Sequence, residues 1–170
     1  DDIVDNNNNL NAKKEIFSKF KKDFENKNFN NQIIKDMWSI IDSENISKKI
    51  VIDLFDGVET DLEETVVINS KKDLLVYSYR VAGTVGLMMS KILKVQSKVA
   101  LKGAIDLGIA MQLTNIARDV CEDKERNRQY VRHDFFSIQE IIKESQIFYE
   151  NSFCAMRNIP FRSRFSVIVA

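Results

Sequence analysis

The sequence predicts an all-α fold, and three observations carry that prediction. Among 170 residues there are only five glycines and one proline (Pro160), which is too few turn signals for a β-sandwich or barrel. Hydrophobic residues make up 44% and charged residues 29%, a globular composition with enough apolar side chains for a core. Apolar residues also recur at helical spacing along most of the chain. We therefore expect residues 1–170 to form one helical domain, or part of one.

The first expected helix covers about residues 10–27. Phe17, Phe20 and Phe24 stand at positions i, i+3 and i+7 in a lysine-rich segment, the spacing of an amphipathic helix. Two interpretations of this phenylalanine stripe stay open. We favour packing against the protein core, and the alternative is peripheral contact with a membrane surface.

Two more helices are expected before residue 60. Apolar residues at helical spacing predict a helix around residues 33–41, which includes Trp38 as a core residue. The same pattern predicts another from near Ser47 to residue 58, followed by an acidic stretch at 59–64. The β-branched run at 65–68 is a short candidate for an extended segment.

Three helices are expected in the second half. Ser70, with Asp73 three residues later, forms a helix-start pattern ahead of an apolar run to about residue 94. A further helix is expected from about residue 97 to 123. A second helix-start pattern at Ser137 predicts a last helix that ends before Pro160.

The composition also narrows the class of protein. Lys plus Arg and Asp plus Glu both number 25, so the zero net charge gives no reason to expect a nucleic-acid partner. Cys121 and Cys154 lack the paired spacing of a zinc site or a disulfide framework, which suits a reducing, cytoplasmic compartment. His133, the single histidine, has no neighbour that suggests a catalytic role. The sequence does not indicate an oligomeric state.

A line of polar side chains is expected on the helix at 97–123. At 100° per residue, Gln112, Asn115, Asp119 and Asp123 fall on one narrow face flanked by apolar positions. A polar stripe in an apolar setting is costly unless something binds to it. The alternative is that the end of this helix is simply solvated.

A second acidic pair lies at the start of the chain. Asp1 and Asp5 would share a face if they lie on a helix, with Asp2 beside them. Carboxylate pairs suit Mg²⁺, which prefers oxygen ligands and often bridges one or two carboxylates to substrate phosphates. The alternative for this segment is an acidic loop.

Residues 77–89 (YSYRVAGTVGLMM) place two glycines inside a strongly helical pattern. Each costs about 1 kcal/mol against alanine, so close packing or a nearby ligand should explain them. On a helical wheel, four residues of this segment fall within a 60° arc. We expect them to form a mostly apolar wall, which is either part of the core or one side of a pocket. They are Tyr77, Val81, Thr84 and Met88.

Three motifs, DDIVD at 1–5, YSYRVAGTVGLMM at 77–89 and LGIAMQLTNIARDVCED at 107–123, together resemble a known family. They are similar to the squalene and phytoene synthase family of head-to-head trans-isoprenyl diphosphate synthases, and most similar to its bacterial phytoene-forming members. Their order and separations match the family, and the resemblance extends to about residue 130. It implies a helical bundle of the isoprenoid-synthase type around a central cavity, here truncated at both ends.

The resemblance also implies site residues. The expected Mg²⁺ ligands, with Mn²⁺ as an alternative metal, are Asp1, Asp2, Asp5, Asp119 and Asp123. Tyr77, Asp119 and Asp123 are the expected catalytic residues. The expected prenyl-chain and pocket residues are Val81, Ala82, Val85, Gln112 and Asn115. Arg118, Arg128 and Tyr130 are expected diphosphate contacts, because arginine binds phosphate oxygens in a bidentate manner. In the Gly-Arg-x-Tyr run that family members often show there, Asn127 replaces the glycine.

The implied activity is the condensation of two geranylgeranyl diphosphates to phytoene through a cyclopropyl diphosphate, without NADPH. Two alternatives stay open: a squalene- or dehydrosqualene-type reaction on farnesyl diphosphate, and a catalytically silent homologue that acts in assembly. A metal clamp suits this chemistry because it stabilises the leaving diphosphate, and an apolar cavity with an aromatic face keeps water from the carbocation.

Overall fold

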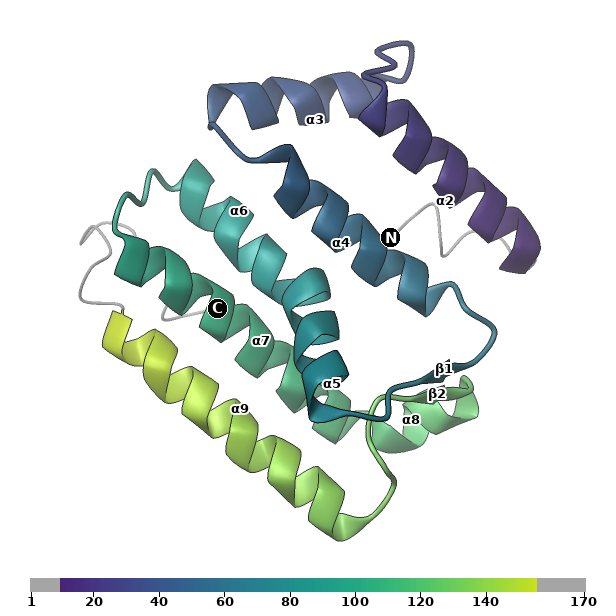
Figure 1. Ribbon diagram of the computed structural model, residues 1–170, viewed down its shortest axis with the longest axis vertical. Helices are drawn as coiled ribbons and strands as arrows, with labels where there is room; N and C mark the ends of the chain where they lie inside the picture. Colours follow the sequence, from purple (N-terminus) through teal and green to yellow (C-terminus); the bar gives the residue numbers. More distant parts are fainter. Residues whose placement is uncertain (1–9, 156–170) are drawn as a thin grey trace.

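The computed structural model describes residues 10–155, and its regular structure is almost entirely helical, as the sequence predicts (Figure 1). The helices are α2 (Leu10–Glu25), α3 (Gln32–Ser43), α4 (Lys48–Asp61), α5 (Lys71–Ser78), the π-helical turn η1 (Tyr79–Gly83), α6 (Thr84–Ile92), α7 (Lys98–Arg118), α8 (Val120–Glu125) and α9 (Phe135–Ala155). The two short strands are β1 (Val66–Val67) and β2 (Arg128–Gln129). The acidic motif at residues 1–5 and Pro160 lie outside the described residues.

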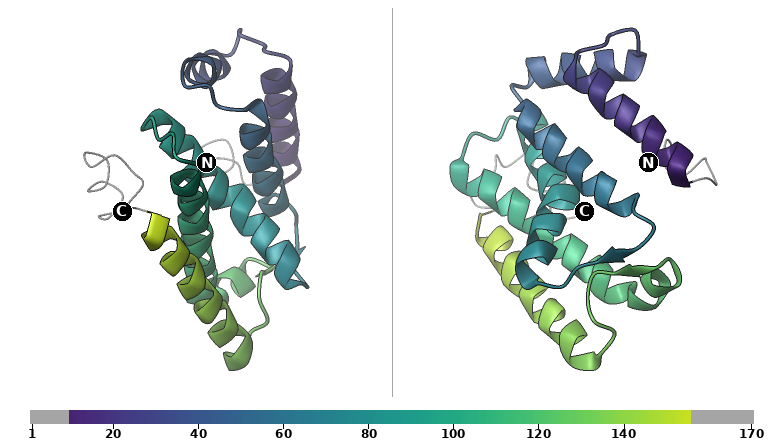
Figure 2. Two further views of the ribbon diagram at one scale, coloured as in Figure 1. Left: turned by 60° about the vertical axis from the view of Figure 1, so that its left-hand side comes forward. Right: turned by 45° about the vertical axis from the view of Figure 1, so that its right-hand side comes forward.

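The long helices lie side by side in the order α2, α4, α6, α7 and α9 (Figures 1 and 2). The rod formed by α5, η1 and α6 passes between α4 and α7, and α3 crosses the top of α2 and α4 in Figure 1. The strands and α8 gather at the opposite end of the molecule. Within residues 10–155, no helix has the length and apolar character needed to cross a membrane.

An aromatic core joins α2, α3 and α4. The rings of Phe17, Phe20 and Phe24 each contact Phe55 edge-on, with centroids 5.1–5.8 Å apart. Trp38 stacks on Phe24, and its indole N–H donates to the Phe24 carbonyl at 3.0 Å. The favoured interpretation of the phenylalanine stripe is therefore confirmed, because its side chains face the protein core, and Trp38 is also core.

Side-chain caps set most of the helix starts. Ser47, Ser70 and Ser97 each accept a backbone N–H in the first turn of α4, α5 and α7, as the sequence predicts. The prediction that Ser137 starts the last helix is wrong. Helix α9 starts at Phe135, and the Asp134 carboxylate accepts the Ser137 N–H at 2.9 Å. Aspartate caps as well as serine does, so the cap lies three residues earlier.

The apolar wall expected from Tyr77, Val81, Thr84 and Met88 does not form as a unit. In η1 the Thr84 N–H donates to the carbonyl of Tyr79, five residues earlier, so the turn holds an extra residue and rotates the helix beyond it. Thr84 is buried with its hydroxyl on the Arg80 carbonyl at 2.7 Å, and Met88 packs on the aromatic core. A wheel with uniform spacing cannot represent this shift.

The helix expected over 97–123 is interrupted at Asp119. This residue has φ −98° and ψ 14°, which ends α7 at Arg118 and lets α8 begin at Val120. Its side chain pairs with Arg118, the kind of local competition that makes aspartate a poor helix former. The polar face predicted for one continuous helix is therefore divided, with Gln112 and Asn115 on α7 and Asp123 on α8.

The helical glycines permit close backbone packing. A Cβ on Gly86 would lie 2.2 Å from the Ala104 carbonyl oxygen, and one on Gly108 would lie 2.4 Å from that of Ala82. Both glycines sit where η1 and α6 cross α7. Close backbone packing therefore accounts for Gly86, one of the two glycines that the sequence singled out, whereas a Cβ on the other, Gly83, would first meet the side chains of Tyr79 and Ile105.

We expect Gly86→Ala to lower the free energy of unfolding by about 1–3 kcal/mol, because the new methyl group meets backbone that cannot move aside. Gly83→Ala is the matched control, since its Cβ would first meet side-chain atoms of Tyr79 and Ile105 at 3.0 and 3.2 Å. Urea denaturation of both variants measures the difference. Equal losses would contradict the backbone-contact explanation.

Candidate active site

A largely apolar groove of about 470 Å³ runs between α6 and α7. Its walls are mostly aliphatic, with Met89, Leu93, Leu107 and Met111 among them. Tyr77, the aromatic residue expected in the pocket, does not line the groove, but five other residues expected there do. These are Val81, Ala82, Val85, Gln112 and Asn115.

The polar end of the groove leads to Asp119. Gln112 and Asn115 are half-buried groove residues on the last two turns of α7, and Asp119 follows one turn later. Its N–H donates to the Asn115 carbonyl at 2.8 Å, which ties the acidic residue to the groove wall. An apolar groove whose polar residues lie one turn before a carboxylate suits a ligand with a hydrocarbon body and a charged head.

Asp119 forms a two-point ion pair with its neighbour Arg118. The guanidinium Nε and Nη2 each lie 2.6 Å from a different carboxylate oxygen. Hydrogen bonding to Arg118 lowers the pKa of Asp119 below its ordinary value, so this carboxylate stays ionised. The Arg118 side chain is 67% exposed and can turn toward a bound anion.

Asp123 lies one turn further along, on α8, and is half-buried. Burial is the main cause that raises its pKa, while the charge of Arg128 opposes that shift and the charge of Asp119 adds to it. A carboxylate whose pKa is raised by burial and by a neighbouring carboxylate gains from a bound cation.

Tyr77 and Tyr130 form a second part of the site, away from the groove lining. Their rings stack with centroids 4.8 Å apart and an interplanar angle of 20°. Both hydroxyls donate to the Asp61 carboxylate, and burial followed by the charge of Asp61 raises the pKa of each phenol. Both tyrosines therefore remain protonated at neutral pH.

Arg128 sits on β2, whose parallel pairing with β1 places Val66 opposite it. Its Nη2 donates to the backbone carbonyl of Asp61 at 3.2 Å. The preceding Asn127 has φ 56°, in the left-handed region that favours glycine and that asparagine tolerates. The replacement of the expected glycine by Asn127 is therefore compatible with this turn.

The donor set suits Mg²⁺ in part. Asp119 and Asp123 supply hard carboxylate oxygens, and Mg²⁺ typically takes one or two protein carboxylates and keeps several waters. Within residues 10–155 no three acidic, histidine or cysteine side chains cluster as a metal site. The remaining expected ligands, Asp1, Asp2 and Asp5, fall outside the described residues.

Sequence reasoning missed Asp61, which joins the two tyrosines and Arg128. The residue lies in the acidic stretch at 59–64 that follows the third predicted helix. One signal was available: a carboxylate in the last turn of a helix opposes the helix dipole and calls for compensating donors.

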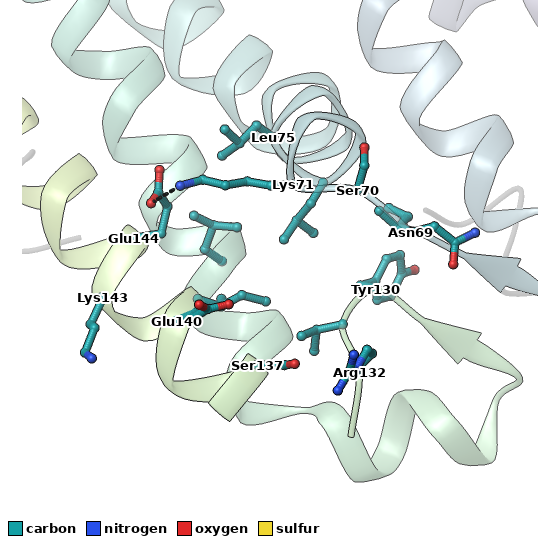
Figure 3. A pocket seen from close by; sticks show the side chains of 15 residues that line it. Asn69, Ser70, Lys71, Leu75, Tyr130, Arg132, Ser137, Glu140, Lys143 and Glu144 are labelled. Atoms are coloured by element: carbon teal, nitrogen blue, oxygen red, sulfur yellow. Dashed lines mark hydrogen bonds and ion pairs between the residues drawn. The ribbon is translucent and has the colours of Figure 1, made fainter. Parts of the chain in front are cut away.

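A second cavity, of about 460 Å³, is lined in part by Tyr130 (Figure 3). Its floor is apolar, and its rim carries charges of both signs. Lys71 reaches across it to Glu144 at 2.6 Å, with Lys143, Glu140 and Arg132 around the opening. The mixed rim charge gives this cavity no clear preference for one ligand class.

Fold and site define an all-α protein with a hydrophobic channel that leads to paired aspartates. The model of the squalene/phytoene synthase family matches residues 1–159, and the chain belongs to that family.

Several curated relatives carry more specific names. The chain is 37% identical over 106 residues to a phytoene synthase of Pseudescherichia vulneris, covering 62% of this chain and 34% of that protein. It is 31% identical over 137 residues to a 15-cis-phytoene synthase of a Paracoccus species, with coverages of 70% and 45%. A 15-cis-phytoene synthase of Enterobacter agglomerans is 43% identical over 89 residues, with coverages of 52% and 30%. The chain thus spans less than half the length of these relatives.

Proposed function

We propose that the protein containing this chain is a prenyltransferase that condenses two geranylgeranyl diphosphates head to head to give phytoene, through a cyclopropyl diphosphate intermediate. The observation that carries this proposal is the groove, which joins five sequence-predicted pocket residues, of which Asn115 lies one helical turn before Asp119. The relatives named phytoene synthase support the choice of product within the family.

The groove residues bind the hydrocarbon. Val81, Ala82 and Val85 on one wall face Leu107 and Met111 on the other, so the prenyl chain leaves water along this surface. The same walls exclude water from the allylic carbocation that forms when diphosphate departs. Gln112 and Asn115 contribute the amide groups nearest the charged head of the substrate.

The acidic end holds the diphosphate. Asp119 and Asp123, with Asp1, Asp2 and Asp5, would hold Mg²⁺, which stabilises negative charge on the leaving diphosphate. Arg118 leaves its pairing with Asp119 to contact phosphate oxygens, and Arg128 remains anchored on the Asp61 carbonyl. Tyr77 and Tyr130 stay protonated and act as neutral aromatic groups beside this end.

The decisive experiment is product analysis with the protein expressed from the complete reading frame around this chain. The enzyme is incubated with geranylgeranyl or farnesyl diphosphate, in Mg²⁺ or in chelator, with and without NADPH. We expect phytoene from geranylgeranyl diphosphate, only with Mg²⁺ and without any need for NADPH.

Other outcomes separate the alternatives. A squalene- or dehydrosqualene-type product from farnesyl diphosphate would keep the metal-assisted chemistry and overturn the substrate. Absence of both product and Mg²⁺-dependent diphosphate binding would favour a catalytically silent helical homologue and overturn the proposal.

A further inference from the structure

Asp61, the last residue of α4, gathers hydrogen-bond donors from segments far apart in the chain. The Tyr77 hydroxyl lies 2.9 and 3.0 Å from its two carboxylate oxygens, and the Tyr130 hydroxyl lies 2.7 Å from Oδ1. Arg128 donates to its backbone carbonyl at 3.2 Å. One residue thus connects α4, α5 and the segment after α8.

The proton arrangement in this cluster follows from the distances. Each phenol has one proton, and the two phenol oxygens are 3.3 Å apart, further than either lies from the carboxylate. Both protons are therefore directed at Asp61, which accepts them as an ionised group. Asp61 thereby determines the rotation of both hydroxyls.

The place of this carboxylate in α4 argues against a purely local role. The C-terminal end of a helix carries partial negative charge, so a carboxylate in the last turn destabilises the helix. No basic residue in the last turn of α4 offsets it. The two tyrosine hydroxyls compensate the negative charge of the carboxylate instead. Asp61 therefore stabilises the contacts of α4 with α5 and with the segment after α8, and not the helix itself.

The cluster borders the acidic end of the site. Strand β2, which carries Arg128, contacts α8, the helix on which Asp123 lies. Any displacement of the tyrosine pair or of Arg128 would therefore change the surroundings of an expected metal ligand.

We propose that Asp61 is a positioning residue, whose carboxylate holds the Tyr77 and Tyr130 hydroxyls beside the diphosphate end of the site. The proposal rests on the proposed function for its catalytic consequence. With Asp61 in place, the stacked phenol pair presents one fixed arrangement to the acidic end. Without it, the two hydroxyls have only each other as partners.

The test is Asp61→Asn in the complete protein, assayed for kcat and KM with geranylgeranyl diphosphate. Asparagine keeps the shape but replaces the charged carboxylate with a neutral amide, whose oxygen is a weaker acceptor for the two phenol protons and whose NH2 group cannot accept them. Because misplacement of catalytic groups by about 1 Å can cost about 100-fold, we expect kcat to fall about 10- to 100-fold with KM nearly unchanged. Glu63→Gln is the matched control, since it removes the same charge two residues later, from an exposed pair with Lys14.

A double-mutant cycle shows whether Asp61 acts through the tyrosines. In a Tyr77→Phe/Tyr130→Phe background, which keeps both rings, Asp61→Asn should cause no further loss of kcat. Independent effects in this cycle, or wild-type kcat in Asp61→Asn, would overturn the proposal. If Asp61→Asn does not fold, the double phenylalanine variant decides alone, and wild-type kcat there would also overturn it.

Chemical denaturation separates this proposal from the proposed function. If the wild-type protein forms no product from prenyl diphosphates, the proposed function fails, and the tyrosine contact is then judged by the free energy of unfolding. Asp61→Asn should lower that free energy in the wild-type protein and should lower it much less in Tyr77→Phe/Tyr130→Phe, where no phenol hydroxyl bonds to the carboxylate. Equal losses in the two backgrounds would overturn the contact itself.

Discussion

Asp119→Asn should reduce product formation by about 100-fold or more, the loss typical for removal of one preorganised electrostatic contact to a developing charge. The substitution keeps the size of the side chain and removes the charge that pairs with Arg118 and that would bind the metal. Initial rates with geranylgeranyl diphosphate at saturating Mg²⁺ measure the effect in the complete protein.

Glu122→Gln serves as the control for this substitution. Glu122 lies three residues further along, is exposed, and contacts the Arg126 guanidinium at 2.6 Å. Its substitution removes the same charge within the first turn of α8, directly after Asp119, and exposed pairs of this kind contribute little to stability. An equal loss of activity in Asp119→Asn and Glu122→Gln would show that only the net charge of this segment matters, and that Asp119 has no specific role.

Phe24→Ala should cause the largest loss of stability of any change considered, about 3–5 kcal/mol of unfolding free energy. Phe24 is 0% exposed, stacks on Trp38 and contacts Phe55 edge-on, so its removal leaves a cavity where three helices meet. Chemical denaturation followed by Trp38 fluorescence measures the loss.

Phe29→Ala is the comparison for Phe24→Ala. Phe29 lies in the turn between α2 and α3 and is 48% exposed, so the same truncation should have a small effect. A Phe24→Ala variant as stable as Phe29→Ala would contradict the central place of the aromatic core.

Much of the fold follows from patterns local in the chain. The phenylalanine spacing at 17, 20 and 24 predicts α2 and its buried face, because helical periodicity and core burial act on the same residues. Ser47, Ser70 and Ser97 mark helix starts since a cap bonds within its own first turn. The resemblance to the family assigned the groove residues from two continuous motifs, one covering η1 and α6 and the other α7.

Local patterns fail where the outcome depends on a contact between distant segments. The π-helical turn at 79–83 changes the phase of the helix, so uniform 100° spacing misplaces Thr84 and Met88. The bend at Asp119 likewise separates Asp123, on α8, from Gln112 and Asn115, on α7. Strand β2 forms only because β1 lies beside it.

Asp61 is the clearest case of what the sequence alone could not supply. In sequence it is one acid in the acidic stretch at 59–64, and its place near the end of a predicted helix does not say which donors compensate it. Its partners lie 16 and 69 residues away, at Tyr77 and Tyr130. The sequence by itself determined most of the helices, the serine caps of α4, α5 and α7, and the motifs of the family. Only the tertiary structure decided which carboxylate the two tyrosines bind, because that choice requires α4, α5 and the segment after α8 to meet.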